Sequence, residues 1–133
     1  MVATLDFEID DMTPEEISVA LDRIRASADV IDAGYALGYG KKGRVRYGVS
    51  VLAKAEASDT VADLCFAETS TLGLRVGEAR RLILARRAME AGGLRVKRAE
   101  RPGGATAKAE SDDLADTPTL AARRAKAAEA EDV

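Results

Sequence analysis

Apolar and polar residues alternate over three segments of the chain. Over residues 4–9 every second side chain is apolar, which is the period of a half-buried β-strand. The same period returns over residues 31–39 and 45–53, where apolar side chains take the odd positions. Between these two segments lies Gly40-Lys41-Lys42-Gly43-Arg44, whose glycines predict a hairpin tip.

A helix is predicted directly after the first strand. Thr13 can cap this helix, Pro14 suits its first position, and Glu16 completes a capping box. Apolar residues then recur at helical spacing over residues 17–24, which predicts one buried face and a helix that ends near Ser27.

A second helix and a fourth strand follow the hairpin. Ser58 is a candidate cap for the helix, and apolar residues follow it at helical spacing. Alternation over residues 72–76 predicts the strand, with a bulge at Gly77 before the run continues through residues 83–84. The order β-α-β-β-α-β is the ferredoxin-like plan, so we predict an α+β fold.

The remainder of the chain has weaker patterns. Residues 85–101 predict another hairpin, which turns at Gly92-Gly93. Residues 102–118 predict an irregular connection in which Asp112-Asp113 is a solvated acidic pair. Thr117-Pro118 opens a final alanine-rich helix with a thin apolar face, which would lie on a partner surface or form a partly frayed tail.

These patterns predict a ferredoxin-like core over residues 1–84 and an extension over residues 85–133. In such a sheet the strands at 31–39 and 72–76 would lie at the edges, and long unprotected edges favour pairing with another chain. We therefore expect a homo-oligomer, with the extension taking part in its assembly.

Composition narrows the function. The formal net charge is −3, which gives no general attraction to nucleic acid or to an anionic membrane. No apolar run reaches the roughly 20 residues of a membrane helix, and the first residues lack a signal pattern. A single cysteine excludes an internal disulfide and indicates a cytoplasmic location. Histidine is absent, so a metal held by this chain would favour oxygen ligands.

The predicted topology brings three polar junctions to one end of the sheet. They are the end of the first strand, the hairpin tip and the end of the second helix, with Asp10, Asp11, Lys41, Lys42, Arg44, Glu68, Thr69, Ser70 and Thr71. Carboxylate oxygens suit Mg²⁺ or Mn²⁺, whereas lysine and arginine suit phosphate, so together they indicate a metal–nucleotide site. Each motif also has a simpler interpretation. The acidic pair is typical of a solvated helix start, the basic tip of an exposed turn, and the hydroxyl-rich segment of a capped turn.

Several motifs resemble one family in the same order. "IDDMTPE", "KKGR", "ETSTLGLR", "RRLIL" and "KAESDDL" are similar to segments of the C-terminal domain of the nickel-insertion protein that makes the nickel-pincer nucleotide cofactor of lactate racemase. The resemblance implies a CTP-dependent cyclometallase, which inserts nickel into a pyridinium bis-thiocarboxylate mononucleotide. It also implies CTP bound with Mn²⁺ or Mg²⁺, a trimer or hexamer, and a separate nickel-binding N-terminal domain.

The resemblance assigns roles residue by residue. Asp10 and Asp11 match the acidic pair, and with Glu68 they are the expected metal ligands. The expected triphosphate and nucleotide contacts are Lys41, Lys42, Arg44, Thr69, Ser70, Thr71 and Arg75. Lys108 and Glu110 match a weaker pattern.

The chain also departs from the family. Glu8 stands where many members have asparagine, and Val45-Arg46 replaces a common Pro-Gly after the basic turn. We do not expect the chain to insert nickel alone, because it has no histidine and only one cysteine. The alternative is a non-catalytic ferredoxin-like module that oligomerises or senses a small molecule.

Overall fold

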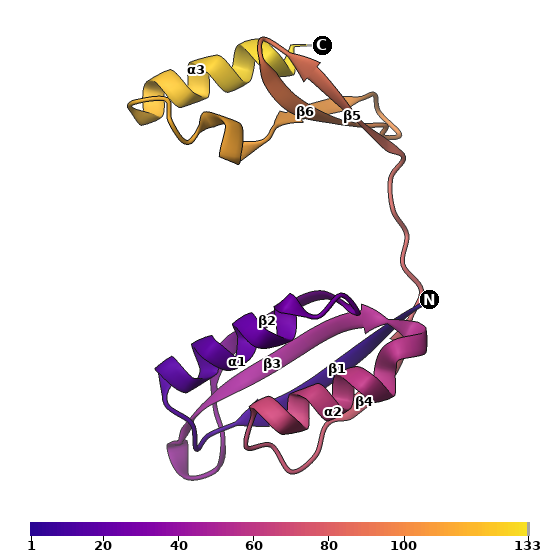
Figure 1. Cartoon of the computed structure of the whole chain (residues 1–133), viewed down its shortest axis with the longest axis vertical. Helices are drawn as coiled ribbons and strands as arrows, with labels where there is room; N and C mark the ends of the chain where they lie inside the picture. The colour runs from indigo at the N-terminus through magenta and orange to yellow at the C-terminus, as the bar shows by residue number, and fades with distance from the viewer. Residues whose placement is uncertain (133) are drawn as a thin grey trace. The chain divides into compact units, whose positions relative to one another are not determined.

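A computed structural model describes residues 1–132, which form two compact units, Met1–Arg81 and residues 82–132 (Figure 1). Each unit contains its own β-sheet and its own cluster of buried apolar side chains. No helix in the described part of the chain is both long and apolar enough to cross a membrane.

The first unit has the predicted ferredoxin-like order. Its elements are β1 (Val2–Ile9), α1 (Pro14–Ala26), β2 (Val30–Tyr39), the 3₁₀ turn η1 (Lys41–Gly43), β3 (Val45–Lys54), the 3₁₀ turn η2 (Ala55–Ala57), α2 (Ser58–Glu68) and β4 (Arg75–Ala79). The sheet order is β2-β3-β1-β4, and all neighbours are antiparallel. This confirms the α+β prediction and places β2 and β4 at the edges.

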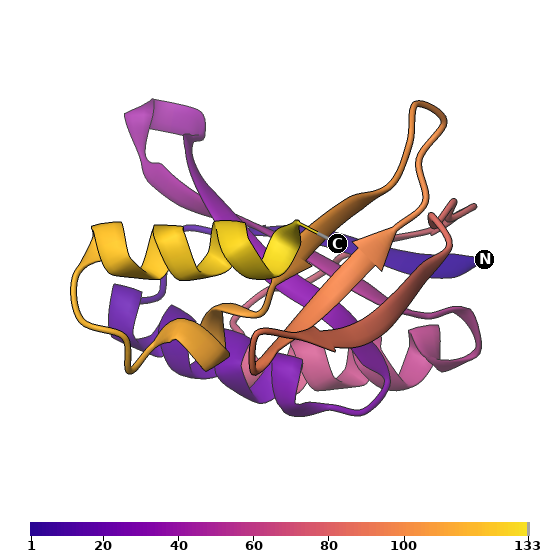
Figure 2. The same ribbon diagram turned by 90° about the horizontal axis from the view of Figure 1, so that it is seen from above.

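Both helices of this unit cover the same face of the sheet (Figure 2). Leu5, Phe7 and Ile9 alternate on β1 and are at most 2% exposed, because they pack beneath Ile17 of α1 and Val61 of α2. The other face of β1 carries the polar residues of the alternation. The alternation in the sequence therefore reflects a strand with one face against the helices and one face turned away from them.

The ends of the two helices have different causes. The capping box between Thr13 and Glu16 is present, and α1 ends at Ala26, as predicted. The prediction that Ser58 caps α2 is wrong, because Ser58 is already the first helical residue and no side chain caps the helix. The 3₁₀ turn η2 leads directly into α2, so the backbone is already helical before the first residue of α2.

The fourth strand is shorter than predicted. It begins at Arg75, and Leu72 is fully exposed ahead of it. Gly77 pairs with Thr4 in an unbroken register, so no bulge occurs there. Pairing ends at Ala79 because its partner, Val2, is the first residue of β1. The run through residues 83–84 therefore lies outside the strand.

The second unit is a small sheet with a helix on one face. It consists of β5 (Arg86–Ala91), β6 (Leu94–Ala99), β7 (Thr106–Ala109), the 3₁₀ turn η3 (Ser111–Leu114) and α3 (Leu120–Glu131), with the strands in the order β5-β6-β7. The predicted turn at Gly92-Gly93 is confirmed, and both glycines have positive φ, which suits a two-residue hairpin.

Three predictions for this region are wrong. Residues 102–118 are not an irregular connection, since they contain β7 and η3. The last helix begins at Leu120 and is capped by Thr119 rather than Thr117. It also has a partner within its own unit, because Ala127 and Ala130 pack with the side chains of β6 and β7. Small alanines let the helix approach the sheet closely, and of this face Ala130 is buried and Ala127 is half-buried.

Candidate functional site

The acidic pair follows β1 directly. Asp10 and Asp11 are both exposed, and the next residues are held by the capping box. The Thr13 hydroxyl accepts from the Glu16 amide at 3.2 Å, and the Glu16 carboxylate accepts from the Thr13 amide at 2.8 Å. These reciprocal bonds fix where α1 begins, and so they fix the position of the two carboxylates before it.

The basic hairpin tip faces this pair. The Gly40 amide donates to the Arg44 carbonyl at 2.8 Å, which closes the turn η1. Lys42 has a φ of 58°, a left-handed conformation that is uncommon for lysine. The Arg44 guanidinium lies 4.0 Å from the Asp10 carboxylate. The tip and the end of β1 are thus neighbours, as the topology predicted.

A pocket of about 270 Å³ lies between these segments, lined by Glu8, Ile9, Asp10, Gly40, Lys41, Arg44 and Arg46. Three cationic and two anionic side chains therefore share one small volume. Sequence reasoning missed Arg46 as part of this lining. The signal was present, because Arg44 and Arg46 are two apart along the chain entering β3 and so project to the same side.

The junction between α2 and β4 meets the acidic pair through a single residue. The Ser70 hydroxyl donates to the Asp11 carboxylate, and the Ser70 amide contacts the Met12 sulfur at 3.4 Å. The hydroxyls of Thr69 and Thr71 donate instead to nearby backbone carbonyls, at 2.8 and 2.7 Å. Of the three predicted hydroxyls, only that of Ser70 contacts an acidic residue of the pair.

The structure does not bring Glu68 to the acidic pair. Its carboxylate accepts from the Arg23 guanidinium of α1 at 2.8 Å. Within residues 1–132, no group of three or more histidine, cysteine, aspartate or glutamate side chains converges on a common point. Two carboxylates still suit Mg²⁺ or Mn²⁺ held by phosphate oxygens, because such ions take only one or two protein ligands beside the phosphates.

Arg75 is engaged by Glu8 of the neighbouring strand β1. Its guanidinium donates two hydrogen bonds to the Glu8 carboxylate, at 3.0 and 2.7 Å. This contact lowers the pKa of Glu8 and raises the pKa of Arg75. A phosphate that uses Arg75 would therefore compete with Glu8.

The two remaining predicted residues belong to the second unit. Glu110 forms an ion pair with Lys97 at 2.5 Å, which lowers the pKa of the Glu110 carboxyl. Lys108 is exposed on β7, directly opposite Lys97 on β6.

These features define a ferredoxin-like module with one charged end, joined to a small sheet-and-helix unit. Residues 1–127 match the model of the family described as Nickel insertion protein, and the chain belongs to this family. The chain is 33% identical over 85 residues to the pyridinium-3,5-bisthiocarboxylic acid mononucleotide nickel insertion protein of Acetivibrio thermocellus. That match covers 64% of this chain and 21% of the relative, so the chain matches about a fifth of the relative's length.

Two solved structures share the fold. One is LarC2, the C-terminal domain of a cyclometallase involved in the synthesis of the NPN cofactor of lactate racemase, in its apo form. It aligns with a TM-score of 0.80 and 24% identity, over 86% of this chain and 81% of LarC2. The other is protein MK0293 from Methanopyrus kandleri AV19, with a TM-score of 0.73 and 21% identity, over 98% of this chain and 84% of that one.

Proposed function

We propose that this chain is the C-terminal-type component of a cytoplasmic nickel-inserting enzyme and that it binds CTP together with Mn²⁺ or Mg²⁺. In this role it would support insertion of nickel, the cargo, into the pyridinium bis-thiocarboxylate mononucleotide precursor of the nickel-pincer cofactor. Membership of the nickel insertion protein family supports the proposal.

One observation supports the nucleotide site most directly. Asp10, Lys41 and Arg44 line the same small pocket, and Asp11 beside them is hydrogen-bonded to Ser70. Asp10 and Asp11 would hold a divalent ion beside the phosphates, and the hairpin cations would bind the rest of the triphosphate. When bound, the ion would neutralise phosphate charge. Asp10 and Asp11 would hold it, while Lys41, Lys42 and Arg44 would orient the phosphates.

Nickel itself requires ligands from elsewhere. The sequence contains no histidine, and its one cysteine, Cys65, is fully buried. Burial raises the pKa of the Cys65 thiol to about 11, which disfavours the thiolate that nickel would need. We therefore propose a separate N-terminal nickel-binding domain as partner, in keeping with the much greater length of the curated relative.

An exposed apolar stripe supports a second role in assembly. Tyr35, Leu37 and Tyr39 on the edge strand β2 are 50%, 66% and 77% exposed. They lie on the face of the sheet that α1 covers further along, where Ala33 is buried. Apolar exposure beside a free strand edge favours a homo-oligomer, and a module that only oligomerises is the second candidate function.

Calorimetry with CTP and Mn²⁺ on the full chain separates the two candidates. Asp10→Asn and Asp11→Asn are expected to weaken Mn²⁺-dependent CTP binding by about tenfold each, because each removes a charged ligand. Lys42→Asn is expected to weaken binding with or without metal, and asparagine tolerates the left-handed backbone of Lys42.

Asp59→Asn is the matched control. Asp59 is an exposed carboxylate in the first turn of α2, at the end of the helix remote from Ser70. The Asp59→Asn variant should leave the affinity for CTP unchanged. Absence of CTP binding at millimolar concentration, with and without Mn²⁺, would contradict the nucleotide proposal and leave the oligomerising module.

A further inference from the structure

The second unit has one covered and one open sheet face. Val96 and Ala109 pair across β6 and β7, and both are buried in the cluster that contains Ala130 of α3. Because side chains alternate along a strand, Lys97 and Lys108, which also pair, project to the opposite face. Arg86 belongs to that open face too, since it pairs with Ala99, two residues from Lys97.

The part of the open face around Lys97 and Lys108 carries more positive charge than its one carboxylate, that of Glu110, neutralises. Lys97 is paired with Glu110, but Arg86, Arg101 and Lys108 have no ion-pair partner among residues 1–132. Like charges directly opposite each other on neighbouring strands are destabilising, and Lys97 and Lys108 are such a pair. An anion bound on the open face between the Lys97 and Lys108 side chains would relieve this repulsion.

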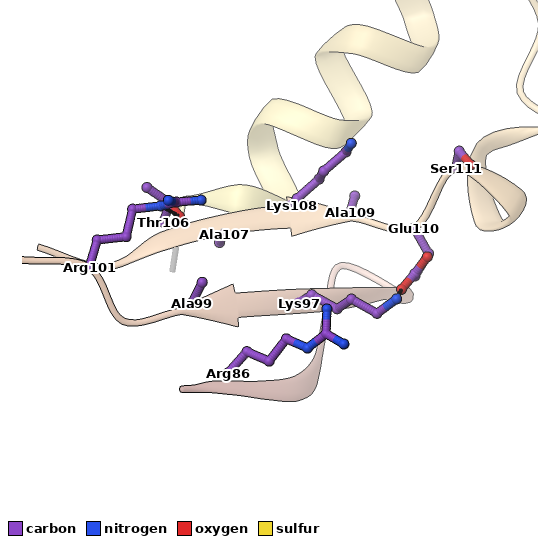
Figure 3. Close-up of a pocket in the computed structure, with 10 residues that line it drawn as sticks. All are labelled: Arg86, Lys97, Ala99, Arg101, Thr106, Ala107, Lys108, Ala109, Glu110 and Ser111. Atoms are coloured by element: carbon purple, nitrogen blue, oxygen red, sulfur yellow. Dashed lines mark hydrogen bonds and ion pairs between the residues drawn. The ribbon is translucent and has the colours of Figure 1, made fainter. Parts of the chain in front are cut away.

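The same face is hollowed. A pocket of about 380 Å³ lies there, and the short side chain of Ala99 stands between the longer ones of Arg86 and Thr106 (Figure 3). The Arg101 guanidinium donates to the Thr106 hydroxyl oxygen at 2.7 Å. The Thr106 hydroxyl hydrogen remains available for an acceptor in the pocket.

We propose that this open face of β5, β6 and β7 is a second binding site, which takes a phosphorylated small molecule through Arg86, Lys97 and Lys108. It shares no residue with the charged end of the first unit, and it does not depend on the proposed CTP site. Glu110 holds Lys97 in place at one side of the pocket.

The charge of the lining favours a phosphate group over an anion with a single charge. Arg86 offers a planar fork that matches phosphate oxygens, and the two lysines supply point charges. Four cations against one carboxylate suit a ligand with two or more negative charges. None of the ten lining residues is aromatic, so the phosphate rather than a base would be recognised.

The test is an NMR titration of the ¹⁵N-labelled full chain, without divalent metal, using tripolyphosphate and ribose 5-phosphate as probes. Saturable amide shifts at Arg86, Lys97 and Lys108 are expected with at least one probe. Tighter binding of tripolyphosphate would assign a polyphosphate chain to the site, whereas tighter binding of ribose 5-phosphate would assign a phosphate monoester.

Paired variants separate a built site from general charge attraction. Arg86→Gln and Lys108→Gln are each expected to lower the affinity for the probe, measured from the shifts at these amides, by about tenfold. Arg87→Gln is the matched control, because Arg87 is exposed on the same strand but projects to the other face, and it should change affinity by less than about twofold. Equal weakening by all three variants, or no saturable shift at these amides, would overturn the proposal. Absence of CTP binding by the first unit would not contradict this proposal for the second unit.

Discussion

Arg75 shows how one neighbouring residue can change the role of another. Its motif resembles a nucleotide-binding segment, yet its guanidinium makes a bidentate contact with Glu8 across the β1–β4 pair. The sequence resemblance predicts that Glu8 departs from the family. It could not show that Glu8 lies within reach of Arg75, because 67 positions separate them along the chain.

Glu8→Gln is therefore expected to increase affinity for CTP. Removal of the carboxylate charge frees Arg75 for phosphate and lowers the negative charge of the pocket. The gain should be about fivefold at most, because exposed ion pairs are weak. Calorimetry with CTP and Mn²⁺ measures it, and Glu78→Gln, an exposed carboxylate on β4 with the same change in charge, is the control. Unchanged affinity in Glu8→Gln would show that Arg75 does not contact the nucleotide.

At the scale of elements, local signals were reliable where the interaction is itself local. The box between Thr13 and Glu16 spans three residues and was readable directly. The limits of β4 were not, because they depend on where β1 offers partners. Likewise α3 contacts β7 through alanines that carry little signal by themselves.

Thr13→Ala is expected to lower the free energy of unfolding by about 1 kcal/mol, since it removes one half of the capping box. Urea denaturation followed by circular dichroism measures this loss. Because α1 would fray next to Asp11, the same variant should also weaken Mn²⁺-dependent CTP binding. Wild-type stability together with wild-type binding would mean that the cap does not position the acidic pair.

Asp113 connects η3 to β6 through hydrogen bonds, although the sequence predicts that Asp112-Asp113 is a solvated pair. Its carboxylate accepts from the Arg95 backbone amide at 2.8 Å and from the Arg95 guanidinium at 2.7 Å. These bonds, first those from the guanidinium, lower the pKa of Asp113 from 3.8 to about 2. Its contribution to stability is therefore complete above pH 3.8 and is lost as the pH falls towards 2.

Asp113→Asn should remove this part of the pH dependence. Near neutral pH the variant is expected to unfold at a lower temperature than the wild type, and the difference should shrink as the pH approaches about 2. NMR signals of β6 amides, followed during heating at several pH values, report on this unit. Asp112→Asn is the neighbouring control, since Asp112 is exposed. A constant difference across the acid range would argue against the ion pair as the cause.

At the scale of the whole molecule, the edge strand β2 leads to a prediction about assembly. Its apolar stripe is exposed in one copy of the chain, so we expect copies to associate. Leu37→Lys should shift the protein towards monomer in light scattering at micromolar concentration. Ala36→Lys places the same charge on the opposite face of β2 and should have a smaller effect. A wild-type monomer under these conditions would contradict the prediction.

The sequence alone determined the first unit's element order, its strand periods and the start of α1, because these depend on residues a few positions apart. It also indicated that the acidic pair, the basic tip and the end of α2 converge, since antiparallel topology dictates which ends meet. Only the tertiary structure decided which side chains touch: Ser70 meets Asp11, whereas Glu68 pairs with Arg23. It likewise decided that Lys97 and Lys108 share an open face. Such contacts depend on register and rotamer across distant strands, and neither quantity is encoded in local spacing.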